Sequence, residues 1–137
     1  MVNVADALKK AQEGKATTGM GIDESGGTII SSAYDLASKI IKADYPVSNW
    51  NIYCFHYSDG DNWSETDNNK SIEIIKNHLL PVSNMIGYVQ INSPGGSGEF
   101  SDVLAAAFPD EKRIILSLID NKEDIIDSIK TLLGKGY

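Results

Sequence analysis

The sequence has one cysteine, no long apolar run and no signal for secretion. Cys54 has no partner for a disulfide, which excludes a disulfide-stapled scaffold and is typical of a reducing compartment. The longest apolar runs are a few residues, far shorter than a membrane span requires. The chain does not open with a charged segment followed by an apolar one, so we expect no secretory signal and a cytoplasmic location.

Basic residues are also scarce. The chain has 12 lysines and arginines against 19 aspartates and glutamates, which gives a net charge of -7. Binding to the nucleic-acid backbone or to an anionic membrane needs a basic face, so we expect neither partner. The 137 residues, 42% hydrophobic and 23% charged, suit one globular domain. Such acidity is compatible with cation binding, although carboxylates usually belong to a solvated surface.

The first 21 residues differ from the rest of the chain. A short helix over residues 4–12 is the structure their pattern favours, but Gly14 and the polar stretch 17–21 would end it quickly. We treat residues 1–21 as a leader whose order the pattern leaves open. The α/β domain is expected to occupy residues 22–137.

From Gly26 onward, helical spacings of apolar residues alternate with short apolar runs. The run at residues 50–57 is almost continuously apolar, which predicts a strand buried on both faces of a parallel sheet. Alternation of strands and helices predicts a three-layer α/β fold, with a parallel sheet and helices on both faces. The expected elements are helix 29–41, strand 50–57, a polar loop 58–69, helix 71–80, strand 85–91, loop 92–98, helix 100–108, strand 113–119 and helix 125–133.

Two polar residues are expected at the same edge of this sheet. Thr28 stands in a Gly-Gly-Thr turn before a helix, and Asp59 follows the strand at 50–57. A hydroxyl and a carboxylate are hard oxygen ligands, suited to magnesium or manganese. In the alternative interpretation, Thr28 only caps its helix and Asp59 only opens a turn with Gly60. The pattern leaves both interpretations open.

Three stretches carry a specific resemblance: GGTIISSAYDLASKII, YPVSNWNIYCFHYSDGDNW and NMIGYVQIN. They resemble the C-terminal part of the YhbH/YeaH-type family of uncharacterised, sporulation-linked proteins, which are similar to von Willebrand factor A domains. The resemblance runs from about Glu24 to the C-terminus. It implies a von Willebrand factor A-like (Rossmann-like) fold and, for the biological process, sporulation or stress.

The resemblance also implies a metal-ion-dependent adhesion site. In the von Willebrand factor A family this site combines a D-x-S-x-S motif, a threonine and an aspartate, and the last two would be Thr28 and Asp59 here. Residues expected in a supporting shell or in contact with a partner are Ser58, Asp61, Asn62 and Trp63.

One part of the family pattern is missing. No D-x-S-x-S motif occurs in the chain, and the nearest string, at residues 23–27, follows no apolar run. The chain therefore corresponds to only the second half of the full sheet, and an ion on two ligands is expected to bind weakly or not at all. The strand at 50–57 would then be an uncovered edge, open to pairing with a second copy or to coverage by residues 1–21.

The function that these features favour is a non-enzymatic protein-binding module. In the family, the ion at the sheet edge completes its coordination with an acidic side chain of the protein partner. One alternative is a magnesium-dependent phosphate-handling enzyme that uses Asp59 and Asp61, although no basic residue near them balances phosphate charge. The other alternative is a structural half-domain that forms a homodimer through its uncovered edge.

Overall fold

The structure, a computed structural model, describes residues 29–135. The expected leader at 1–21 and the predicted ligand Thr28 lie outside the described residues. None of the helices within the described range combines the length and the apolar character that crossing a bilayer requires.

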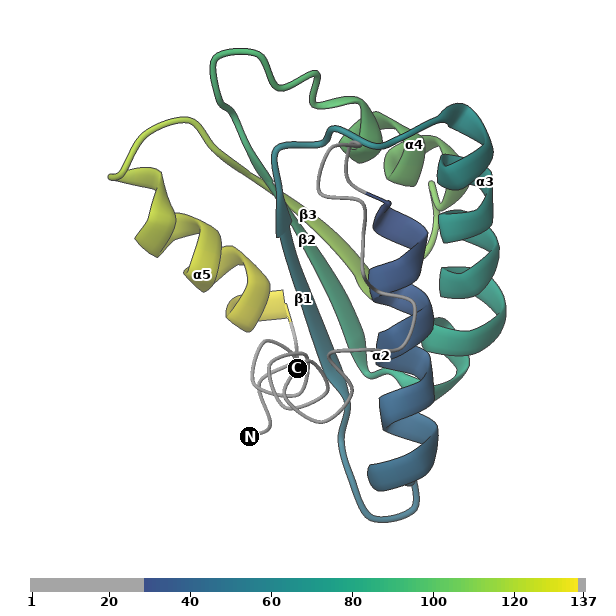
Figure 1. Ribbon diagram of the computed structural model, residues 1–137. Helices are drawn as coiled ribbons and strands as arrows, with labels where there is room; N and C mark the ends of the chain where they lie inside the picture. Colours follow the sequence, from purple (N-terminus) through teal and green to yellow (C-terminus); the bar gives the residue numbers. More distant parts are fainter. Residues whose placement is uncertain (1–28, 136–137) are drawn as a thin grey trace.

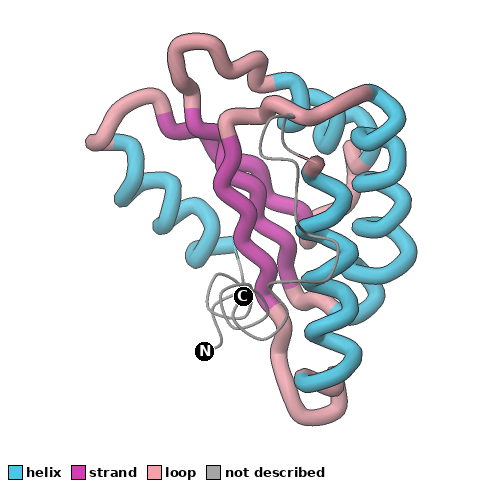
Figure 2. Tube along the Cα trace, in the orientation of Figure 1, coloured by secondary structure: helices cyan, strands magenta, loops and turns pink. Residues whose placement is uncertain are grey.

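Three parallel strands form the sheet (Figure 2). They are β1 at Tyr53–Ser58, β2 at Met85–Ile91 and β3 at Ile114–Ile119, in the spatial order β1-β2-β3. The register places Tyr53 opposite Met85. The central strand β2 is buried along almost its whole length, and its predicted bounds are confirmed.

The helices cover the sheet on two sides (Figure 1). One face carries α2 at Ile30–Asp44, α3 at Glu65–Ile74 and α4 at Glu99–Ala107, while α5 at Asp124–Lys135 lies on the other. Strands that follow one another in order, joined by crossovers of one hand, place α3 and α4 on the same face. The α/β class, the parallel sheet and the helices on both faces are confirmed.

The face under α2, α3 and α4 holds the larger core. Alternate strand residues point into it, among them Cys54 and His56 from β1 and Tyr88 from β2. The His56 ring meets Tyr34 and Tyr88 edge-on at centroid distances of 5.2 and 5.1 Å. Phe100 of α4 is fully buried against these rings, so aromatic side chains fill the centre of this layer.

The face under α5 is covered by that helix alone among the described elements. Its buried residues are Met85, Val89, Ile115, Ile119 and Leu132. Gly87 brings α5 close to the sheet, because a Cβ there would lie 2.7 Å from Leu132 Cδ2. The α5 residues Ile125, Ile126, Ile129 and Leu133 stay exposed.

The first strand corrects two expectations. It begins at Tyr53 rather than at residue 50, and Trp50 lies in the preceding loop, where it packs edge-on against Tyr45 at 5.3 Å. It is not buried on both faces, since Tyr57 is 47% exposed. Tyr57 lies opposite Val89, on the face of the sheet that α5 covers, and among the described strands α5 packs mainly against β3.

The expected loop at 58–69 is also wrong in its second half, because α3 already begins at Glu65. Ser64 caps this helix by accepting a hydrogen bond from the Asp67 amide at 3.1 Å. The helix then continues through a π-helical turn, η1 at Ile75–Leu79, and a 3-10 turn, η2 at Leu80–Val82. The polar first turn of α3 lacks the apolar spacing that would reveal a helix.

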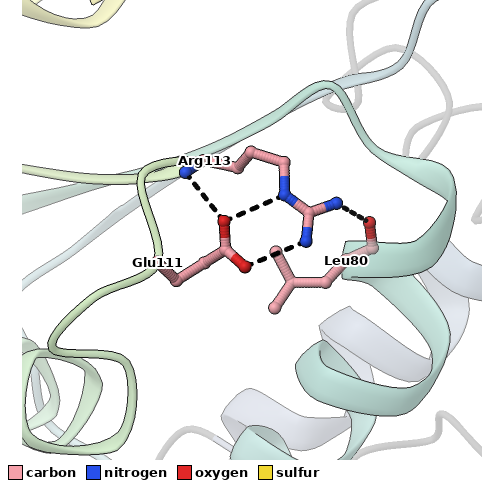
Figure 3. A network of polar contacts seen from close by, with 3 residues as sticks. All are labelled: Leu80, Glu111 and Arg113. Atoms are coloured by element: carbon pink, nitrogen blue, oxygen red, sulfur yellow. Dashed lines mark hydrogen bonds and ion pairs between the residues drawn. The ribbon is translucent and has the colours of Figure 1, made fainter.

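At the edge of the sheet where the strands begin, Arg113 links two segments of the chain (Figure 3). Its Nε and Nη2 donate to the two carboxylate oxygens of Glu111, both at 2.9 Å, and its Nη1 donates to the Leu80 carbonyl at 2.8 Å. Hydrogen bonds from Arg113 lower the pKa of Glu111 to about 2. This arrangement ties the start of η2 to the start of β3.

Candidate functional site at the carboxyl edge of the sheet

The carboxyl ends of the three strands lie together at one edge, the upper end in Figure 1. The amino terminus of α2 lies at the same edge, because the Ile30 amide bonds to Asn62 in the loop after β1. The start of α2 and the loop after β1 therefore meet at this edge, while the Gly-Gly-Thr turn itself lies outside the described residues. This edge is where open α/β sheets place their ligand sites.

Asp59 follows directly on β1, and its side chain is exposed. Its Oδ1 accepts a hydrogen bond from the Asp61 amide at 3.1 Å. Its backbone carbonyl is held more firmly, by Gln90 Nε2 at 2.6 Å and by the Gly98 amide at 3.3 Å. The main chain thus fixes the position of a carboxylate that faces solvent.

Gly60 and Gln90 lock the loop behind this carboxylate. Gly60 is buried with a φ of 84°, and a Cβ at that position would lie 2.6 Å from Gly98 Cα. The Gln90 side chain is 4% exposed and accepts a hydrogen bond from Tyr88 Oη at 3.0 Å. The loops at 58–64 and 92–98 therefore form one packed unit.

Ser58 and Asp61, two of the predicted supporting residues, stabilise these loops. Ser58 Oγ accepts a hydrogen bond from the Gly60 amide at 3.0 Å. Asp61 Oδ1 accepts one from the Ser97 amide at 2.8 Å, and this bond lowers the pKa of Asp61. Asp61 therefore accepts a hydrogen bond that joins the loop at 58–64 to the loop at 92–98.

Asn62 joins the loop after β1 to the start of α2. Its Oδ1 accepts hydrogen bonds from the amides of Ile30 at 3.0 Å and Trp63 at 2.9 Å. Its Nδ2 donates to Asn68 Oδ1 of α3 at 2.8 Å. All polar atoms of this side chain are engaged in linking three segments.

Asp67 is a residue that sequence reasoning missed. It is 8% exposed, and its carboxylate accepts hydrogen bonds from both the amide and the hydroxyl of Ser31. Burial raises its pKa, but the hydrogen bonds from Ser31 outweigh that effect, so the pKa lies below its usual value. The local signal was the Ser64-x-x-Asp67 spacing of a helix cap, which reveals nothing of the contact with α2.

Trp63 gives this edge an exposed aromatic surface. Its side chain is 61% exposed, the largest value among the aromatic residues of the described range. Ile29 is also exposed. It precedes Ile30, whose amide donates to the same Asn62 oxygen as the amide of Trp63. Apolar surface therefore lies at the same edge of the sheet as Asp59.

Acidic residues surround this edge. Among the described loops and first helical turns that form this edge, Lys122 is the only basic residue. Their carboxylates belong to Asp59, Asp61, Glu65, Asp67, Glu99, Asp102, Asp120, Glu123, Asp124 and Asp127. The resulting negative potential attracts cations and repels phosphate.

The described residues alone supply too few ligands for a metal centre. Within residues 29–135, no three His, Cys, Asp or Glu side chains gather where they could hold one ion. Asp59 is a single oxygen donor, and Thr28 lies outside the described part. The pairing of Thr28 with Asp59 stays a prediction.

An open hollow of about 440 Å³ lies beside the loop unit. It is bounded by the ends of β2 and β3 and by the first turn of α4, and Ser97 and Gly98 form its rim toward the loop unit. Its polar lining includes Asn92, Ser101, Asp102 and Ser117. These side chains offer hydrogen bonds but no basic group.

A family model described as "Protein of unknown function (DUF444)" matches residues 7–136. A UPF0229 protein of Ruminiclostridium cellulolyticum is 45% identical over 119 residues, which cover 82% of this chain and 28% of that protein. A UPF0229 protein of Clostridium botulinum is 42% identical over 113 residues, which cover 80% of this chain and 27% of the relative. The chain thus spans little more than a quarter of the length of these relatives. No solved structure matches it.

Proposed function

The chain belongs to the family described as protein of unknown function (DUF444), and from the geometry of its sheet edge we propose that it is a non-enzymatic protein-binding module. The proposal includes membership of the YhbH/YeaH type and a von Willebrand factor A-like fold. The observation that carries it is Asp59, an exposed carboxylate on a locked loop directly after β1.

The proposed site is one divalent cation held by Asp59 and Thr28. Carboxylate and hydroxyl oxygens fit magnesium or manganese, which retain several water ligands when the protein supplies few. Thr28 stands two residues before Ile30, whose amide is bonded to the Asp59-bearing loop. This proximity in the chain supports the pairing of the two ligands.

The ion would control which partner binds. An acidic side chain of a protein partner is repelled by the many carboxylates of this edge unless a cation lies between them. A carboxylate of the partner would displace one water from the ion, while Trp63 and the loop at 92–98 contact the surrounding surface. Binding of the partner would therefore require both the ion and an acidic group.

Calorimetric titration with Mn²⁺ tests the site. The chain is expected to bind with a dissociation constant on the order of 10⁻³ M, and Asp59→Ala should abolish the binding because it removes the only carboxylate ligand. Asp110→Ala, an exposed carboxylate beyond α4 at the opposite edge, is the matched control and should bind as the unaltered chain does. Equal affinity of Asp59→Ala and the control would contradict the proposal.

Self-association is a second candidate, favoured by the free side of β1. Within residues 29–135 this strand pairs only with β2, and Tyr57 on it is exposed. Pairing of two β1 strands would satisfy their backbone groups and cover Tyr57. Sedimentation should then show a dimer that Tyr57→Lys converts to monomer, whereas a monomeric chain at high concentration would exclude this role.

The phosphate-handling alternative has less support. A phosphate ester at Asp59 and Asp61 would meet a surface whose loops offer only Lys122 as a basic group. Turnover of a generic phosphate ester that is lost in Asp59→Ala would restore this alternative.

A further inference from the structure

The strand β3 has one side that pairs with no described strand. It is the outer strand at the end of the sheet away from β1 (Figure 2). The carbonyls of Arg113 and Ile119 accept hydrogen bonds of 2.8 and 2.9 Å from the Ile86 amide and from the amide that follows β2. Successive residues of a strand direct their backbone groups to opposite sides, so Leu116 and Leu118 direct theirs away from β2. Their amides and carbonyls form the free edge of β3.

This edge carries none of the usual protection against another strand. Free edges are commonly blocked by a charged residue or a proline. The six residues of β3, IILSLI, include neither. Leu118 is 50% exposed, and no described strand lies beyond it. An apolar edge of this kind is suited to receive an added strand.

The hollow of about 440 Å³ lies along the same edge. Leu116 and Leu118 stand opposite Tyr88 and Gln90 in the register, so their side chains lie on the face of the sheet that carries α4. Both leucines line the hollow, and Asp102 lines it from the first turn of α4. A strand added to β3 would direct alternate side chains into the space between the leucines and that turn.

Asp102 determines which side chain fits there. It is exposed and forms no ion pair with another residue of the described range 29–135. The lining has no basic residue to neutralise it. Lysine and arginine have an apolar stem, which suits Leu118, and a cationic end, which suits the carboxylate. The hollow therefore matches a basic side chain better than an apolar or acidic one.

We propose that β3 and the first turn of α4 bind an extended segment of a protein partner, which adds to the free edge of β3 as a strand and places a lysine or arginine in the hollow. Main-chain hydrogen bonds to Leu116 and Leu118 supply affinity, and the contact of the basic side chain with Asp102 supplies selectivity. This surface is separate from Asp59 and uses no ion. The inference therefore goes beyond the proposed function, and its failure would leave that function untouched.

The first test is a titration with the fluorescent peptide Thr-Val-Thr-Lys-Thr-Val-Thr, blocked at both ends and followed by anisotropy without divalent ions. Threonine and valine favour the extended conformation, and the lysine is the only charge. The same peptide with glutamate in place of lysine should bind at least about tenfold more weakly, because the edge is acidic. Equal affinity for the two peptides, or binding of neither, would contradict the proposal.

Asp102→Asn tests the contact in the hollow. It should weaken binding of the lysine peptide roughly fivefold, the upper range for an exposed ion pair, and leave binding of a peptide with methionine in that place unchanged. Glu99→Gln is the matched control, because it removes the same charge from the same turn of α4 but lies outside the lining. Equal losses in the two variants would show a general effect of charge and overturn the role of Asp102.

Hydrogen exchange locates the peptide on the chain. The Leu116 and Leu118 amides should exchange rapidly in the free chain and slow when the lysine peptide is added, whereas the Ser117 amide, which faces β2, should be slow in both states. Slowing at Tyr57 instead would place the peptide on β1 and overturn the proposal. So would slowing at Leu116 and Leu118 that grows with the concentration of the chain alone, because the occupant would then be a second copy.

N-methylated peptides test the added strand without altering the protein. Only alternate amides of an added strand face β3, so methylating the amides of valine and lysine, or those of threonine, should abolish binding in one case and spare it in the other. Equal affinities of the two methylated peptides would mean that the peptide binds without pairing to the edge, which would contradict the proposal.

Discussion

The described helices cover the two faces of the sheet to different extents. Under α2, α3 and α4, alternate strand residues meet fully buried partners such as Tyr88 and Phe100. Under α5 one helix covers three strands, and four of its apolar side chains remain exposed. The comparison indicates that the three-helix face supplies most of the stability, because it buries more apolar side chains. Among the described residues, exposed apolar surface lies on α5 and at Tyr57 of β1.

The largest expected effect comes from the centre of the three-helix face. Phe100→Ala should lower the free energy of unfolding by about 3–5 kcal/mol, because it leaves a cavity among the rings of Tyr34, His56 and Tyr88. Ile129→Ala on α5 should cost under about 1 kcal/mol, since that side chain is already exposed. Urea denaturation of both variants measures the difference. Similar losses of unfolding free energy in the two variants would contradict the difference between the two faces.

Acid should destabilise the three-helix face through His56. Burial lowers the pKa of His56 to about 4 in the folded state, from 6.5 in the unfolded chain, and Tyr34 Oη lies 2.7 Å from its Nδ1. The unfolded chain therefore binds more protons between these values. Stability falls as the pH drops from about 6.5 to 4, by roughly 3 kcal/mol, and this contribution changes no further below pH 4.

The measurement is urea denaturation of the unaltered chain and of His56→Phe at several pH values. Carboxylates titrate in both proteins, so the difference between the two curves isolates the histidine. His56→Phe should lose less stability between pH 6.5 and 4. Parallel curves would show that His56 does not sit in the apolar layer in solution.

A smaller effect is expected where α5 meets the sheet. Gly87→Ala would place a Cβ 2.7 Å from Leu132 Cδ2 and 3.2 Å from Phe55 Cδ1, so both side chains must move. The expected cost is about 1–3 kcal/mol, with methyl signals of Leu132 shifted and those of the three-helix face unchanged. Gly134→Ala, with no atom near the new Cβ, is the control and should stabilise α5 slightly. Changes spread over both faces would contradict an independent single-helix layer.

How well the sequence predicted each element depended on how that element is buried. The strand β2 was predicted to its ends because it is buried on both faces and its apolar run is continuous. The start of β1 was wrong because the apolar run begins in the preceding loop, where Trp50 packs against Tyr45. Asp59 was placed correctly at the sheet edge by the change from apolar to polar residues. The bond from Asp67 to Ser31 was not foreseeable, since it depends on the packing of α2 against α3.

The smallest expected effect sharpens the comparison most. Ile126 on α5 is 63% exposed, so Ile126→Lys should change the stability of the chain by no more than about 0.5 kcal/mol. Phe100 tolerates no such change, because the three-helix face is closed. A loss of 2 kcal/mol or more in Ile126→Lys would mean that something covers α5 in solution. If that loss grows with protein concentration, the cover is a second copy of the chain; if it does not, the cover belongs to the same chain.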